Sequence, residues 1–254
     1  MKPLYRDRNS PCYFAAFNRI ELLVVVGLTV ALIYIAFFLP PGASVKEPYV
    51  DRLAFQRITC ENNLKQIGTT YLMWANDNGS RYPFNTPISN GGWNDLLSGG
   101  NAGPCCWTNY ALMAGEMPSS RVLACPVDIR KPAADFGSFT NNTALSYFVG
   151  VQANEDNPKS ILGGDRNLAL GEVPDWTYGL SPAGGNGNDV VITKPVCWSL
   201  AMHSQGNPAG AGNILFADGS VRPTISSEQL RTNILHAGSL RDGIKSAGLR
   251  LVFP

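Results

Sequence analysis

The sequence predicts an α+β protein in which a long N-terminal transmembrane helix and a second helix precede an antiparallel β-sheet domain with loop insertions. An apolar run without charge covers residues 22–39, and helical periodicity follows it over 49–79. The remainder alternates short apolar segments with Gly, Pro and Asn, which is typical of strands and turns. We therefore divide the chain into a basic leader (1–16), an apolar helix (17–40), a Pro/Gly break (41–48), a helical stem (49–79) and a β-rich globular domain (80–254).

The composition limits the classes of function. With 254 residues, of which 44% are hydrophobic, the chain is long enough for a substantial packed core. Lys and Arg number 20 and Asp and Glu number 19, so the formal net charge is +1. This balance gives no basic surface of the kind that binds nucleic acid, and we expect no nucleic-acid partner.

The apolar run Leu22–Leu39 reads "LLVVVGLTVALIYIAFFL". At about 1.5 Å per residue it nearly matches a bilayer core of roughly 30 Å, whereas the apolar core of a signal peptide is only about 7–15 residues long. Upstream, Lys2, Arg6 and Arg8 outnumber Asp7. The positive-inside rule then predicts a single span with the N-terminus in the cytoplasm and everything after Pro40 outside.

Two opposite charges, Arg19 and Glu21, stand at the start of this run. One explanation is an ion pair at the level of the lipid headgroups, which needs no further function. The residues around Arg19 and Glu21 suggest a second explanation for the glutamate.

The segment "AFNRIELLVVVGLTVALIYIAFFLP" resembles the N-terminal segment of type IV prepilins and type II secretion pseudopilins. The matching positions are Ala16, Phe17, Ile20, Glu21 and Pro40. The resemblance implies that a prepilin peptidase cuts between Ala16 and Phe17 and then methylates the amine of Phe17. It also implies that Glu21 neutralises the amine of a neighbouring subunit during assembly.

The implied function is that of a structural subunit of a type II secretion pseudopilus or a type IV pilus-related filament, and not that of an enzyme. The implied partners are the prepilin peptidase, other pseudopilin subunits in homo- or hetero-assembly, and the inner-membrane secretion platform. The implied location is the inner (cytoplasmic) membrane, which the chain crosses once, with a periplasmic or cell-surface C-terminal domain.

A second resemblance covers blocks scattered over the rest of the chain. "CENNLKQIG" (60–68), "CPVD" (125–128), "LSYFVG" (145–150) and "GGDRN" (163–167) resemble a pseudopilin-like family of planctomycete and verrucomicrobial bacteria that carries a processing-associated H-X9-DG domain. The H-X9-DG positions are His203, Asp218 and Gly219, here separated by fourteen residues instead of nine. The role of this motif is open.

Local patterns predict several elements of the globular domain. "NILFADGSV" predicts a hairpin with a two-residue turn at Asp218-Gly219. Ser226, with Gln229 three residues later, predicts a capped helix. His203 has two explanations, as a metal ligand or proton carrier, or as a hydrogen-bonded residue that orients the loop before the hairpin. Short strands are expected in "SYFVGV", "LALGEV" and "DVVITKPVCW".

The six cysteines are residues 12, 60, 105, 106, 125 and 197. Cys12 lies in the leader, and the other five would lie where disulfides are permitted. Their connectivity cannot be read from the sequence. The chain has no C-x-x-C pair, which argues against a structural zinc site.

The alternative function is a signal-anchored carbohydrate-binding or metal-dependent hydrolytic domain. We expect no resident cofactor, and Ca²⁺ near "GGNGND" is the one candidate ion. No common catalytic motif supports hydrolysis. The residues that the alternative would use are Asp128, Asp165, His203 and Asp218 for a metal, Asp189 for calcium, and Trp93, Trp107, Trp176 and Trp198 for a sugar groove.

Overall fold

A computed structural model of the chain describes residues 18–38, 48–204, 207–239 and 248–254. The chain divides into two compact units, Met1–Pro48 and Tyr49–Pro254, which are described separately. The expected leader, the cleavage site at Ala16 and Phe17, and nearly all of the expected Pro/Gly break lie outside the described residues.

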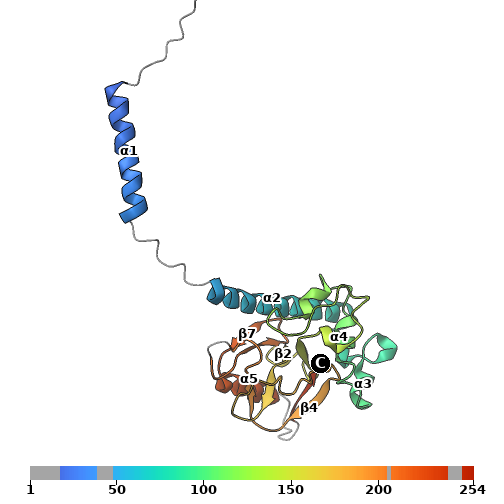
Figure 1. The fold of residues 1–254 in the computed structure, drawn as a ribbon. Helices are drawn as coiled ribbons and strands as arrows, with labels where there is room; N and C mark the ends of the chain where they lie inside the picture. The colour runs from blue at the N-terminus through green and yellow to red at the C-terminus, as the bar shows by residue number, and fades with distance from the viewer. Residues whose placement is uncertain (1–17, 39–47, 205–206, 240–247) are drawn as a thin grey trace, which may run out of the picture. The chain divides into compact units, whose positions relative to one another are not determined.

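The first unit contains helix α1, Arg19–Phe38 (Figure 1). Its described side chains, from Asn18 to Tyr34, are all exposed. In the described part of the chain, no helix combines the length and the hydropathy required of a membrane span. The transmembrane part of our prediction for residues 17–40 is therefore not confirmed.

The second unit begins with helix α2, Pro48–Asp77, which is the predicted helical stem. The helix ends where the amide of Ser80 donates to the carbonyl of Ala75 and Gly79 adopts a φ of +67°, a left-handed conformation that glycine tolerates. Residues spaced three and four apart turn one face of α2 inward from Cys60 onward, as the periodicity predicted. Ile58, which the same periodicity places on this face, is instead 56% exposed. The buried members of this face are Cys60, Leu64, Ile67, Tyr71 and Trp74.

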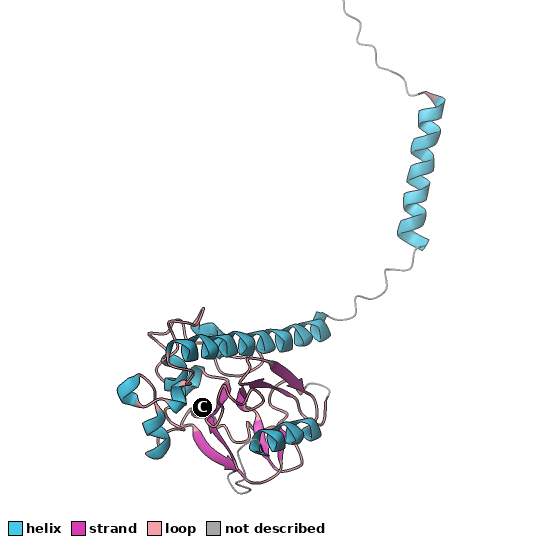
Figure 2. Ribbon diagram, turned by 180° about the vertical axis from the view of Figure 1, so that it is seen from behind, coloured by secondary structure: helices cyan, strands magenta, loops and turns pink. Residues whose placement is uncertain are grey.

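Strands form the centre of this unit (Figure 2). Six of them make an antiparallel sheet in the order β4-β8-β1-β2-β6-β7, and β3 and β5 form a second, two-stranded sheet. The predicted α+β class with an antiparallel sheet is confirmed. The strands are β1 (Tyr147–Gly150), β2 (Ile161–Asp165), β3 (Leu168–Leu170), β4 (Asn188–Ile192), β5 (Val196–Trp198), β6 (Gly212–Phe216), β7 (Val221–Thr224) and β8 (Leu249–Phe253).

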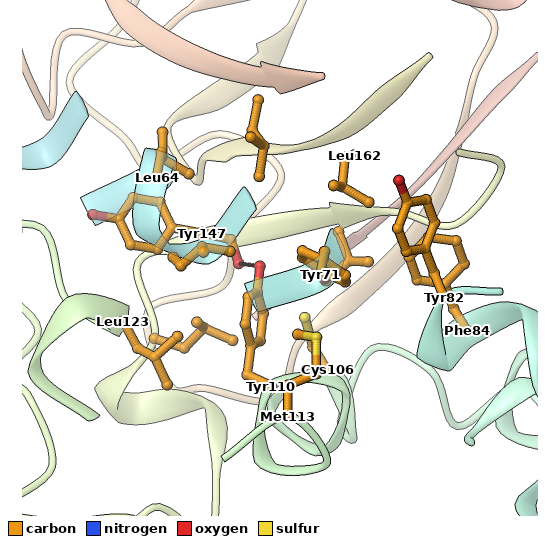
Figure 3. Close-up of a cluster of buried hydrophobic side chains, with 14 of the residues drawn as sticks. Leu64, Tyr71, Tyr82, Phe84, Cys106, Tyr110, Met113, Leu123, Tyr147 and Leu162 are labelled. Atoms are coloured by element: carbon orange, nitrogen blue, oxygen red, sulfur yellow. Dashed lines mark hydrogen bonds between the residues drawn. The ribbon is translucent and has the colours of Figure 1, made fainter. Parts of the chain in front are cut away.

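Both faces of the large sheet are covered, so its central strands are buried on both sides. Side chains that alternate along β1 belong to different cores: Tyr147 and Val149 pack with α2, whereas Phe148 packs with α5, Ser227–Ser239. The first core is rich in aromatic rings, and Figure 3 shows Tyr110 reaching the backbone of β1 within it.

Short helices contribute side chains to the core on the α2 side of the sheet. The short helices are η1 (Pro83–Asn85), η2 (Ile88–Asn90), α3 (Asn94–Ser98), α4 (Cys106–Ala111), η3 (Ser120–Leu123) and η4 (Asn142–Ala144).

The predicted hairpin joins β6 to β7, but its turn is longer than the two residues expected. The amide of Gly219 donates to the carbonyl of Phe216, and the amide of Phe216 donates to the carbonyl of Ser220. A two-residue turn at Asp218-Gly219 would require a positive φ at both residues. In the longer turn only Gly219 takes a positive φ, +78°. The predicted cap of α5 is present, since Ser226 Oγ accepts the amide of Gln229 at 3.2 Å.

Gly68 sets how closely α2 approaches this hairpin. A Cβ atom at Gly68 would lie 2.8 Å from Leu215 Cδ1 and 3.1 Å from Gly219 Cα. We expect Gly68→Leu to lower the free energy of unfolding by about 1–3 kcal/mol, because the helix must move off the sheet. Denaturant titration of the full chain in detergent measures the change.

The matched control is Gly115→Leu, at an exposed position where a Cβ atom meets nothing within 4 Å. It should change the free energy of unfolding by less than about 0.5 kcal/mol. Equal stabilities of the two variants would contradict the packing described for α2.

Candidate functional site

Four side chains with metal-ligand chemistry converge between α2 and the sheet: Cys60, Cys125, Asp165 and His203. One donor atom from each lies within 4.8 Å of all the others. Cys60 comes from the buried face of α2 and Asp165 is the last residue of β2. Cys125 follows η3, and His203 lies in the loop between β5 and β6. Segments distant in the sequence therefore build one cluster.

The contacts within this cluster are short and specific. The Cys60 thiol donates to Asp165 Oδ1 at 3.1 Å and also lies 3.3 Å from the hydroxyl of Tyr147. His203 Nε2 lies 3.3 Å from Asp165 Oδ2 and 3.4 Å from Cys125 Sγ. The side chains of Asp165 and His203 have no exposed surface, so the cluster is closed to solvent.

Asp165 is held in place from the sheet. Its Oδ2 accepts the backbone amide of Asn213 at 2.7 Å and the side-chain amide of the same residue at 2.9 Å. These bonds, made from β6, fix the plane of the carboxylate and turn its other oxygen toward Cys60. The carboxylate is thus oriented independently of the two cysteines.

His203 occupies an unusual backbone conformation. Its φ is +47°, and among the described non-glycine residues only Ser80 shares a positive value. Such a conformation costs of order 1–3 kcal/mol and persists only where surrounding contacts enforce it. The Nδ1 atom is buried and has no hydrogen-bond partner among the described residues. The strained backbone of His203 thus places its Nε2 atom within the cluster.

The surroundings shift the pKa values of His203, Cys60 and Cys125 in different directions. Burial opposes a charged imidazole, but the charge and hydrogen bond of Asp165 outweigh it and raise the pKa of His203 from 6.5 to about 10. Burial raises the pKa of the Cys60 thiol well above its ordinary value. For Cys125, burial is outweighed by the hydrogen bonds from Cys60 and His203, so its pKa is lowered. Cys125 is therefore the more acidic thiol of the two.

The segment that carries Asp165 continues with two more polar residues, Arg166 and Asn167, which are also fully buried. Arg166 makes a two-pronged salt bridge to Asp128, with Nε–Oδ2 and Nη2–Oδ1 both at 2.7 Å. Asn167 donates to the carbonyls of Ser199 and Ala211 at 3.1 and 3.0 Å. Three consecutive buried polar side chains thus each bind a different part of the chain.

The structure brings together only two of the carboxylate and imidazole residues that the sequence suggested as metal ligands, Asp165 and His203. Asp128 is paired with Arg166, and both oxygens of Asp189 accept from Arg250 at 2.9 and 2.6 Å. Asp218 lies in the hairpin turn, where it accepts the amide of Ser220.

At the other end of the described chain, Glu21 lies in the first turn of α1. Its Oε2 accepts the amide of Asn18 at 3.1 Å, as the glutamate of a capping box does. The ion pair with Arg19 that we considered is not among the salt bridges of the described residues.

Cys60 and Cys125 are the two cluster residues that sequence reasoning missed as ligands. Both stand in blocks that we singled out, "CENNLKQIG" and "CPVD", but nothing in their spacing pairs them. All five cysteines of the described residues are free thiols.

The chain matches no protein-family model, no curated protein and no solved structure.

The buried pair of Asp128 and Arg166 gives a test of stability. Burial raises the pKa of Asp128, but Arg166 and the hydroxyl of Ser146 outweigh it, so the pKa lies below its ordinary value. The stabilisation is complete at neutral pH and is lost as the pH falls through the lowered pKa. Asp128→Ala leaves a buried guanidinium unpaired, and we expect a loss of about 3–5 kcal/mol in the free energy of unfolding.

The control is Glu172→Ala, which breaks a 4.0 Å pair between the exposed Glu172 and the partly exposed Arg231. It should cost less than about 1 kcal/mol. Thermal and denaturant unfolding at pH 7 measure both variants, and a similar small loss for Asp128→Ala would contradict the buried pair.

Proposed function

We propose that this protein is a pseudopilin-like structural subunit of a type II secretion pseudopilus or a type IV pilus-related filament. The observation that carries the proposal is helix α1, whose apolar surface is exposed all round. Side chains such as Leu23, Val30 and Leu32 are 60–71% exposed. Apolar surface of this extent is normally covered by lipid or by neighbouring helices.

The charges on α1 fit an assembly helix. Arg19 and Glu21 are its only charged residues, and both lie in the first turn. In the unprocessed chain Glu21 accepts the amide of Asn18 and so caps its own helix. Cleavage before Phe17 would create an amine with a pKa of about 7.7–8.0, largely protonated at neutral pH. Glu21 of one subunit would then neutralise the Phe17 amine of its neighbour.

The proposed arrangement keeps α1 in the inner membrane with its N-terminal end toward the cytoplasm. The unit that begins at Tyr49 would lie in the periplasm or at the cell surface. The prepilin peptidase would process the chain, and the inner-membrane platform would add it to other pseudopilin subunits. A helical stem that packs on an antiparallel sheet, as α2 does, suits a domain carried on such a helix.

The alternative of a sugar-binding or hydrolytic domain has less support. Trp93 and Trp198 are fully buried and donate their indole N–H groups to Asn109 and Thr224, so they serve the core. The Asp165 and His203 side chains are closed to solvent, and a substrate has no access to them.

The mature N-terminus tests the proposal directly. Mass spectrometry of the protein isolated from its own membranes should find N-methyl-Phe17 as the first residue. An intact Met1 on most of the protein would contradict processing and would favour a plain signal anchor.

Assembly is tested by Glu21→Ala, which should leave the chain in the membrane fraction and abolish cross-linking between subunits. The control is Glu228→Ala, which removes an exposed glutamate from α5 and should leave cross-linking unchanged. Undiminished cross-linking of the Glu21 variant would contradict the role assigned to this carboxylate.

A further inference from the structure

We propose that Cys60, Cys125, Asp165 and His203 bind one structural zinc ion. This inference concerns the globular unit alone and holds whether or not the chain assembles into a filament.

The donor set of this cluster fits zinc better than calcium. Two thiolates and an imidazole are ligands for Zn²⁺ and other borderline or soft ions, whereas Ca²⁺ takes six to eight oxygen ligands. A single carboxylate completes a set of four, which is the coordination number of structural zinc sites. The sequence argument against zinc relied on the missing C-x-x-C pair, and here the cysteines come from separate segments.

The two contacts that His203 Nε2 makes within the cluster have the spacing expected around one tetrahedral ion. Zinc bonds of about 2.3 Å to sulfur and 2.0–2.2 Å to nitrogen or oxygen place neighbouring ligand atoms about 3.3–3.8 Å apart. The contact of Cys125 Sγ with His203 Nε2 measures 3.4 Å, and that of His203 Nε2 with Asp165 Oδ2 measures 3.3 Å. Cys60 Sγ contacts the other oxygen of this carboxylate, Asp165 Oδ1, at 3.1 Å, so the carboxylate has to shift slightly for one oxygen to complete the set of four ligands. One donor atom of each side chain already lies within 4.8 Å of the other three.

The surroundings resemble the outer shell of a metal site. Asn213 fixes Asp165 through two hydrogen bonds. The hydroxyl of Tyr147 lies within hydrogen-bond distance of the Cys60 sulfur, at 3.3 Å. Partners of this kind orient metal ligands and tune their basicity. The left-handed backbone of His203, which costs free energy, is accounted for if Nε2 must reach an ion.

Because the site is buried and has four protein ligands, we assign the ion a structural and not a catalytic role. All four positions of a tetrahedron are filled by protein atoms, and no exposed ligand position is left for a substrate. The ion would join α2, the loop after η3, the end of β2 and the loop before β6. Its binding would therefore stabilise the packing of the helix on the sheet.

A disulfide between Cys60 and Cys125 is the competing use of these thiols. It would need two cysteines only, and it would not account for the convergence of Asp165 and His203 on the same point. The experiment distinguishes the two.

The full-length chain should be produced with zinc in the medium and purified in detergent under non-reducing conditions. We expect an equimolar amount of zinc by plasma mass spectrometry. We also expect that Co²⁺, exchanged for zinc, gives thiolate charge-transfer absorption and the intense visible bands of tetrahedral cobalt. Removal of the zinc should lower the melting temperature by about 5 °C or more. A chain without bound metal, cobalt spectra without thiolate bands, or a Cys60–Cys125 disulfide in peptide maps would each overturn the proposal.

Variants locate the site. Cys125→Ser and His203→Gln should lose stoichiometric zinc, and Asn213→Ala should weaken zinc binding about 10–100-fold through the outer shell. The control is Cys197→Ser, which changes a buried thiol on β5 outside the cluster and should keep zinc and the cobalt spectrum. Retention of full zinc affinity by both ligand variants would overturn the assignment. The spectra of the unsubstituted chain decide the question even if a ligand variant does not fold.

Discussion

The globular unit is organised around three consecutive polar side chains at the end of β2. Asp165, Arg166 and Asn167 have no exposed surface, so each needs partners inside the protein. A buried charge that loses its partner costs several kcal/mol, which is a large fraction of the stability of a typical domain. The fold is therefore restricted to arrangements that supply all of these partners at once.

The partners come from segments that are far apart in the sequence. Arg166 binds Asp128 in the loop after η3, and its guanidinium also stacks 3.6 Å from the ring centre of Tyr178. Asn167 binds the backbone on both sides of the loop that carries His203. Asp165 then faces α2 on one side and that loop on the other. The packing that gives Asp165 its hydrogen-bond partners also brings Cys60, Cys125 and His203 together beside it.

Much of the architecture could be predicted from local patterns. The spacing of Leu64, Ile67 and Tyr71 identified the buried face of α2, and alternation in "SYFVGV" identified β1. Strand β2 was missed because "ILGGD" contains two glycines, which are poor strand formers. Gly164 is used there for close packing, since a Cβ atom would lie 2.8 Å from the ring of Phe148. Only the tertiary structure reveals this reason.

The site was predictable only in part. Asp165 and His203 were identified as candidate ligands by residue type, but so were Asp128 and Asp189, which arginines neutralise in the folded chain. Residue type cannot tell a free carboxylate from a paired one, because the partner is set by the fold. Cys60 and Cys125 carry no sequence spacing that joins them, and the helix–sheet packing alone brings their sulfur atoms together.

The proposed metal centre between α2 and the sheet consists of Cys60, Cys125, Asp165 and His203. X-ray absorption at the zinc edge of the full-length chain would identify its ligands. We expect zinc coordinated by two sulfur atoms at about 2.3 Å and two nitrogen or oxygen atoms at about 2.0–2.2 Å. A first shell of nitrogen and oxygen alone would contradict it.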